Sequence, residues 1–171
     1  MKKILNTKVM VTLALLIAIN LILTRIFVIY FSDFSRFDLG NVPLILAGLF
    51  FGPAAGAIAG AAADILGSVV LSGRGWFPPL TIGPVLMGLI PGLLRRFLIK
   101  KNTLPRVLAI VILTEAVASL AWKAWCLATL YHVDYSIVFI ARLPVVILLM
   151  AVETALVYIL FKRLLKVLRP Q

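Results

Sequence analysis

The chain of 171 residues is 63% hydrophobic and only 13% charged. That composition excludes a water-soluble domain, which needs a larger polar surface, and favours an all-α bundle in lipid. The length leaves room for one bundle, so residues 1–171 are expected to form a single transmembrane domain. The net charge of +11 is compatible with nucleic acid. We exclude that partner, because the basic residues stand where apolar runs stop and have no interleaved aromatic side chains.

Six apolar segments follow one another, separated by polar, glycine-rich or proline-rich breaks. They predict transmembrane helices at about 7–30, 42–52, 54–71, 80–99, 104–131 and 137–168. The Gly52-Pro53 pair predicts a tight turn between the second helix and the third. Pro144 predicts a kink or an interruption in the sixth. Loops are expected at residues 31–40, 72–79 and 132–136.

Lysine and arginine gather in three clusters: the N-terminal segment, the break between the fourth and fifth helices, and the C-terminal segment. None of the three segments contains an acidic residue, whereas the other breaks contain Asp33, Asp38 and Asp134. Positively charged loops stay in the cytoplasm. Six crossings place all three clusters on one side, which predicts that both termini are cytoplasmic.

Six ionisable residues interrupt the apolar segments: Arg25, Asp64, Glu115, Lys123, Arg142 and Glu153. Charged groups inside a membrane are costly and usually face a cavity or a partner. Counted from the cytoplasmic helix ends, the three carboxylates lie roughly 14–17 Å deep, near the midplane, and the three cations lie closer to the outer boundary.

Helical spacing places Glu115, Ser119, Trp122 and Lys123 on one stripe. We therefore expect an outward-opening pocket with aromatic walls, deep acceptors and an outer ring of cations. Two structural alternatives stay open. The acids and cations could simply neutralise one another inside the bundle, and Trp122 and Trp125 could form an interfacial belt.

No catalytic arrangement competes with a binding pocket. His132 is the single histidine and Cys126 the single cysteine, so no His/Cys cluster has metal-ligand spacing. The chain also lacks a GxxxxGK[ST] phosphate loop. We expect no enzyme activity, no metal and no cofactor. The deep carboxylates leave a stand-alone secondary transporter coupled to protons or Na⁺ as one alternative.

Two stretches carry a family resemblance: RFDLGNVPLILAGLFFGPAAGAIAGAAADILGS at 36–68 and GRGWFPPLTIGPVLMGLIPGLL at 73–94. Together they resemble the substrate-binding S component of energy-coupling factor (ECF) vitamin transporters, and within that group the folate type. The resemblance implies a bacterial plasma-membrane protein that captures a vitamin from outside. It also implies delivery to a transmembrane coupling protein and two ATP-binding subunits, which alone would use ATP.

The resemblance also implies where ligand and partner bind. An AxxxA motif in the first helix, which would contact the coupling protein, maps to Ala14 and Ala18. For folate, a deep carboxylate (Asp64, Glu115 or Glu153) would accept from the pterin edge. Trp122, Trp76 and Phe77 would contact the ring, and Arg25, Arg74, Lys123 or Arg142 would bind the glutamate tail. Pantothenate, a pyrimidine precursor or thiamine remain alternative ligands.

Overall fold

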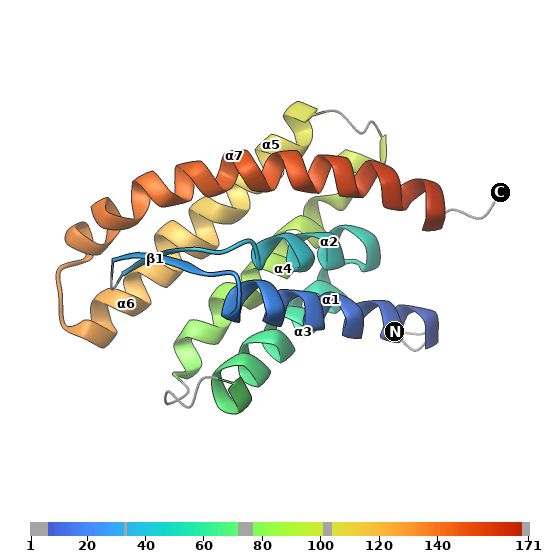
Figure 1. Cartoon of the computed structure of the whole chain (residues 1–171). Helices are drawn as coiled ribbons and strands as arrows, with labels where there is room; N and C mark the ends of the chain where they lie inside the picture. The colour runs from blue at the N-terminus through green and yellow to red at the C-terminus, as the bar shows by residue number, and fades with distance from the viewer. Residues whose placement is uncertain (1–6, 33, 72–76, 101–103, 169–171) are drawn as a thin grey trace.

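The computed structural model describes residues 7–32, 34–71, 77–100 and 104–168. In chain order the elements are α1 (Thr7–Arg25), β1 (Ile29–Ser32), β2 (Ser35–Phe37), α2 (Asn41–Phe51), α3 (Pro53–Ile65), the π-helical η1 (Leu66–Leu71), α4 (Pro78–Lys100), α5 (Leu104–Glu115), the π-helical η2 (Ala116–Lys123), α6 (Ala124–Tyr131) and α7 (Tyr135–Leu168). Each of the six expected segments is helical over most of its length. The start of α1 and the end of α7 lie at one end of the bundle, opposite the hairpin of β1 and β2 (Figure 1).

Four described helices are long and apolar enough to cross a membrane: Thr7–Arg25, Pro78–Leu98, Leu104–Tyr131 and Tyr135–Arg163. Two more apolar helices, Asn41–Phe51 and Pro53–Val69, are shorter. The turn predicted at Gly52-Pro53 is present, because α2 ends at Phe51, α3 begins at Pro53 and Gly52 adopts a φ of 99°. The helix α7 runs through Pro144 without the predicted interruption.

The predicted end of the first helix is wrong. The helix α1 stops at Arg25, and the segment expected to continue it to Tyr30 enters an antiparallel hairpin in which Ile29 pairs with Phe37. The β-branched and aromatic residues of 26–31 favour a strand. The expected loop 31–40 is therefore partly a hairpin, which lies toward the end of the bundle away from the two termini (Figure 1).

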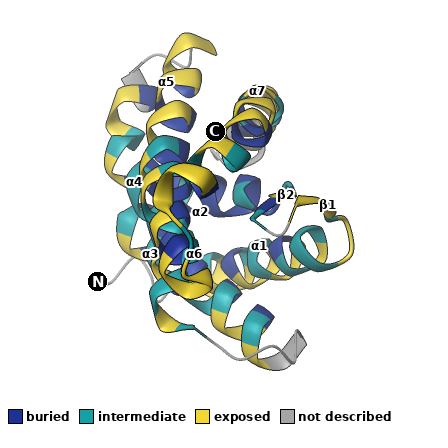
Figure 2. Cartoon of the chain, turned by 90° about the vertical axis from the view of Figure 1, so that its left-hand side faces the viewer, coloured by how far each residue is buried: buried dark blue, intermediate teal, exposed yellow. Residues whose placement is uncertain are grey.

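The middle of the molecule is the helix α2, which is buried from Val42 to Leu49 and lies inside a ring of helices with exposed outer faces (Figure 2). Glycines bring α2, α3 and α4 into backbone contact. A Cβ on Gly88 would meet the carbonyl of Gly56 and lie 2.9 Å from its Cα, and one on Gly92 would lie 2.5 Å from the backbone nitrogen of Pro53. Small residues one turn apart permit this approach in lipid. We call this contact the glycine seam.

Candidate functional site

A small polar cavity of about 30 Å³ lies where α1, α3, α4 and η2 meet the hairpin. Its walls are Asn20, Thr24, Arg25, Arg36, Asp38, Asn41, Leu44, Ala63, Asp64, Pro84 and Lys123. We call it the polar chamber. It concentrates charged and amide side chains inside a largely apolar bundle, and such groups in a membrane-embedded bundle mark a ligand or ion site.

The roof of the chamber is held by short polar contacts. The Arg36 guanidinium pairs with Asp38 at 3.0 Å, and the other oxygen of Asp38 accepts a hydrogen bond of 3.2 Å from the Gly40 amide. Asn20 Nδ2 of α1 donates to the Gly40 carbonyl oxygen at 2.6 Å. These bonds fix the segment between β2 and α2 over the end of α1, and so they position the hairpin above the chamber.

Two cations reach the chamber across glycines. The aliphatic part of Lys123 lies over Gly83, where a Cβ would be 2.8 Å from the lysine side chain. Arg25 lies over Gly67 in the same way, with its Nη2 2.9 Å from the position of a Cβ. Lys123 has no ion-pair partner within 4.0 Å in the part of the chain that the structure describes, and the Nε of Arg25 has no hydrogen-bond acceptor. Both cations are available to an anion.

Arg142 lies behind the chamber and joins three elements. From α7 its Nη1 donates to the Phe34 carbonyl oxygen of the hairpin at 2.9 Å, and its Nη2 donates to Ser119 Oγ of η2 at 2.8 Å. Its Nε has no acceptor among the described residues. The hairpin is therefore tied to the bundle through a guanidinium with spare donor capacity.

The carboxylates lie at two levels. Asp64 borders the chamber and accepts a hydrogen bond of 2.7 Å from Thr81 Oγ1. Glu115 and Glu153 are fully buried behind it. Asn41 connects the two levels, because it lines the chamber and donates to Glu115 Oε1 at 2.8 Å. Neither Glu115 nor Glu153 forms an ion pair within 4.0 Å with a described cation.

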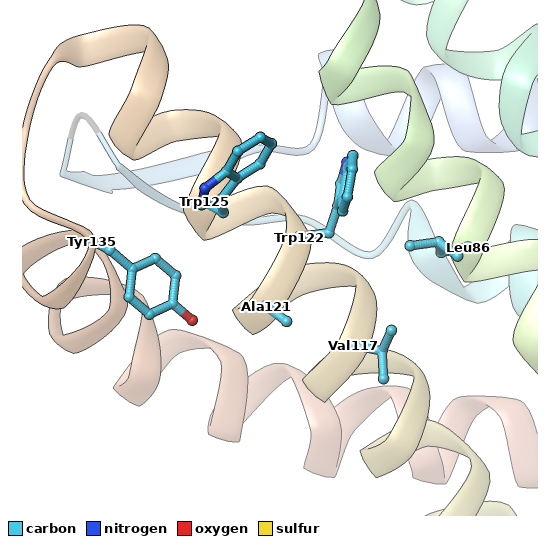
Figure 3. Close-up of a pocket in the computed structure, with 6 residues that line it drawn as sticks. All are labelled: Leu86, Val117, Ala121, Trp122, Trp125 and Tyr135. Atoms are coloured by element: carbon cyan, nitrogen blue, oxygen red, sulfur yellow. The ribbon is translucent and has the colours of Figure 1, made fainter.

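A second, apolar hollow of about 430 Å³ lies between α4 and the helix formed by α5, η2 and α6. Its walls are Leu86, Val117, Ala121, Trp122, Trp125 and Tyr135, and the two indole rings lie side by side (Figure 3). Trp122 Nε1 donates to the Pro79 carbonyl oxygen at 2.8 Å. We call this hollow the tryptophan groove.

The groove separates residues that the sequence placed on one stripe. Lys123 faces the polar chamber, whereas Trp122 faces the tryptophan groove. The reason is local, since η2 is π-helical from Ala116 to Lys123. Its wider turns change the spacing at which residues share a face, and π-helical turns are frequent at functional sites.

The structure thus brings Arg25, Asp64 and Lys123 together around the chamber, with Arg142, Glu115 and Glu153 one layer behind. Phe77 lies half-buried just before α4, while Arg74 and Trp76 fall outside the described residues. Ala14 and Ala18 are exposed on α1. Sequence reasoning missed the chamber residues Asn20, Thr24, Arg36, Asp38 and Asn41. An asparagine inside the apolar run TLALLIAINLIL was the signal that could have revealed Asn20.

Several apolar helices long enough to cross a membrane surround a small charged chamber. The described residues contain no group of three His, Cys, Asp or Glu residues that could hold a metal ion. Apolar helices around a charged chamber are the features of a membrane solute-binding protein. The chain belongs to the family of ECF-type riboflavin transporter S components, whose model matches residues 4–166. It is therefore a multi-pass protein of the bacterial plasma membrane and a transporter component rather than an enzyme.

Individual relatives agree with the family. The chain is 27% identical to the folate transporter FolT of Clostridium novyi (strain NT) over 158 residues, which cover 92% of this chain and 88% of that protein. The crystal structure of FolT bound with folic acid matches with a TM-score of 0.78 and 25% identity, over 90% of this chain and 92% of the other. A structure of the S component of a bacterial ECF transporter shares the fold, with a TM-score of 0.69, 24% identity and coverage of 95% and 98%.

Proposed function

We propose that the chain is the folate-binding S component of an ECF-type importer. The observation that carries this proposal is the similarity over nine-tenths of the chain to a FolT structure bound with folic acid. The chamber adds a chemical argument, because among the described residues Arg25 Nε has no acceptor and Lys123 has no ion-pair partner within 4.0 Å. The glutamate tail of folate carries two carboxylates, which such cations bind through charge-assisted hydrogen bonds.

The orientation that we propose has the pterin ring deep and the tail near the hairpin. Asp64 in the chamber wall, with Glu115 behind it, would accept from the N–H edge of the pterin. Arg25 and Lys123 line the chamber together with Arg36 of the hairpin, and Arg142 bonds to the hairpin from behind. Glu153 lies behind Glu115 as a supporting group. The ring contacts expected of Trp122 and Phe77, and the tail contact expected of Arg74, stay predictions.

Binding requires the chamber to widen. Pockets for small molecules usually enclose about 300–1,000 Å³, whereas the polar chamber holds about 30 Å³. Lifting the hairpin would break the bond from Arg142 to the Phe34 carbonyl and would leave that guanidinium free to bind a carboxylate of the tail. The hairpin would then close over the ligand as a lid.

The membrane arrangement and the partners belong to the same proposal. Six crossings put both termini in the cytoplasm and the hairpin outside, in agreement with the three clusters of Lys and Arg. The single domain would act with a transmembrane coupling protein and two ATP-binding subunits, which alone would consume ATP, and would need no cofactor. The exposed Ala14 and Ala18 lie one turn apart and give α1 a flat face for a coupling helix.

Isothermal titration of the detergent-purified chain tests the ligand, with folate, riboflavin and a pterin that lacks the glutamate tail. We expect one-to-one binding of folate and much weaker binding of the pterin. Riboflavin is the competing ligand because the matching family model is described as a riboflavin transporter component. Riboflavin has no carboxylate for the chamber cations to bind. Tight binding of riboflavin alone, or of neither vitamin, would overturn the folate proposal.

Uptake by reconstituted vesicles tests the mode of transport. Folate should enter only when the coupling protein, the ATP-binding subunits and ATP are all present. Uptake by the chain alone in a proton or Na⁺ gradient would instead establish the secondary transporter, the alternative that the buried carboxylates left open.

A further inference from the structure

Two buried carboxyl groups meet where α2, α5 and α7 converge. Glu115 ends α5 and Glu153 lies in the middle of α7, and neither has any solvent-exposed surface. Each acid lies within electrostatic reach of the other, and Asn41, the first residue of α2, donates to Glu115. The pair lies behind the polar chamber rather than in its wall.

The hydrogen-bond inventory of the pair is incomplete. Asn41 Nδ2 donates to Glu115 Oε1 at 2.8 Å. Glu115 Oε2 and both oxygens of Glu153 have no donor in the part of the chain that the structure describes. A buried acceptor without a donor is costly, and a buried carboxylate facing another carboxylate is more costly still.

The neighbouring charged residues do not supply the missing hydrogen-bond donors or a countercharge in direct contact. Lys123 of η2 and Arg142 of α7 face Glu115, and Asp38 faces Glu153 from the segment after β2. None of them lies within 4.0 Å as an ion-pair partner of either glutamate. Asn41 of α2 and Ser119 of η2 are the polar neighbours of Glu115, and both are uncharged. One proton placed between the two carboxyl groups would remove one charge and provide a donor.

We propose that Glu115 and Glu153 together bind one proton, with Glu153 as the neutral acid whose O–H donates to Glu115. Glu115 keeps the negative charge, because it accepts from Asn41 and faces both cations. Glu153 has no donor of its own among the described residues. The pair is thus a proton-binding site between three helices.

This proton changes the charge that a ligand meets. The cations in and behind the chamber are Arg25, Arg36, Lys123 and Arg142, and the acids are Asp38, Asp64, Glu115 and Glu153. With all groups ionised the charges cancel, and with Glu153 neutral one cation is in excess. An excess cation favours a ligand with carboxylates, a consequence that rests on the proposed function, whereas the proton site itself does not.

Infrared spectroscopy of the purified chain without any vitamin tests the proton directly. The spectrum at neutral pH should contain the carbonyl stretch of a protonated carboxylic acid, and Glu153→Gln should remove it, whereas Asp134→Asn in the α6–α7 turn should not. A wild-type spectrum without an acid band would overturn the proposal, and this result needs no variant to fold. A band that survives Glu153→Gln unchanged would also overturn it.

Thermal unfolding gives a second test. A glutamine N–H can replace the acid O–H, so Glu153→Gln should melt within about 3 °C of wild type, while Glu153→Ala should melt roughly 10 °C lower. If Glu153 were ionised, Glu153→Gln would remove an uncompensated buried charge and raise the melting temperature well above wild type, against the proposal. A third result would also overturn the proposal. If Na⁺ raised the melting temperature of wild type at constant ionic strength, and did not do so for Glu153→Gln, the pair would bind a metal ion in place of the proton.

Discussion

The glycine seam and the polar chamber lie side by side in one small bundle but are built on opposite principles. In the seam, glycines of α2, α3 and α4 place backbone against backbone, and a single added Cβ would collide. In the chamber, Arg25 Nε has no acceptor and Lys123 has no ion-pair partner among the described residues, and behind it Arg142 holds the hairpin by one contact. We therefore expect substitutions in the seam to act mainly on stability and substitutions in the chamber to act mainly on ligand binding.

The strongest way to break the seam is Gly88→Leu. A Cβ at this position would meet the Gly56 carbonyl and lie 2.9 Å from the Gly56 Cα, and backbone cannot move aside as a side chain can. We expect a loss of about 3 kcal/mol or more in the free energy of unfolding. The measurement is thermal unfolding in detergent, with Ala109→Leu on the exposed side of α5 as the control. A variant that melts like the control would mean that the seam is loosely packed.

The chamber should respond to substitution in the opposite direction. Lys123→Met keeps the aliphatic stem over Gly83 and removes a half-buried charge without an ion-pair partner among the described residues. We expect the melting temperature to rise, and folate to bind roughly 10–100-fold more weakly, because a charge-assisted hydrogen bond contributes about 1.5–3 kcal/mol.

Two comparisons make this prediction sharp. A pterin without the glutamate tail should bind the Lys123→Met variant and wild type equally well, because this ligand has no carboxylates for Lys123 to bind. The matched control is Lys162→Met, which removes a cation lying 5.9 Å over the Tyr158 ring near the other end of α7. Equal losses for folate and the pterin would reverse the proposed orientation.

Sequence reasoning recovered the architecture well, because it depends on features that are local in the chain. Apolar segment length and the break at Gly52-Pro53 identified six helical segments. The membrane orientation that the basic clusters predict stays a prediction. The family resemblance was confirmed by a match over residues 4–166. The end of α1 was missed because the hydrophobic run continues past Arg25, and only pairing with residues 35–37 makes it a strand.

The site was predicted less completely, for a physical reason. A stripe of residues assumes regular α-helical spacing, and η2 abandons that spacing between Glu115 and Ala124, so Trp122 and Lys123 face different hollows. Asn41 was missed because its importance comes from Glu115, which lies 74 residues away in sequence. Charged residues inside the membrane could be found from one sequence, whereas their partners required the fold.

A smaller substitution tests whether Gly83 makes room for the Lys123 side chain or belongs to the backbone contacts of the glycine seam. Gly83→Ala adds a single methyl group that would lie 2.8 Å from Lys123 Cε, so the lysine side chain must shift while the helix backbone stays in place. We expect folate affinity to fall about fivefold, near 1 kcal/mol, with little change in the melting temperature. Titration calorimetry and thermal unfolding of the same sample measure both. A large loss of stability would show that Gly83 belongs to the seam.

The smallest effect is expected in the tryptophan groove. Trp125 is half exposed and contacts Trp122 with ring centroids 5.5 Å apart, yet it does not border the polar chamber. Trp125→Leu should leave the folate dissociation constant within about twofold of wild type, a change of less than 0.5 kcal/mol. Trp122→Leu is the paired variant, and it should cost about 1 kcal/mol of stability through its bond to Pro79. A tenfold loss of folate binding in Trp125→Leu would instead show that the tryptophan groove is part of the ligand site. The ligand site would then include apolar groove residues as well as the polar chamber.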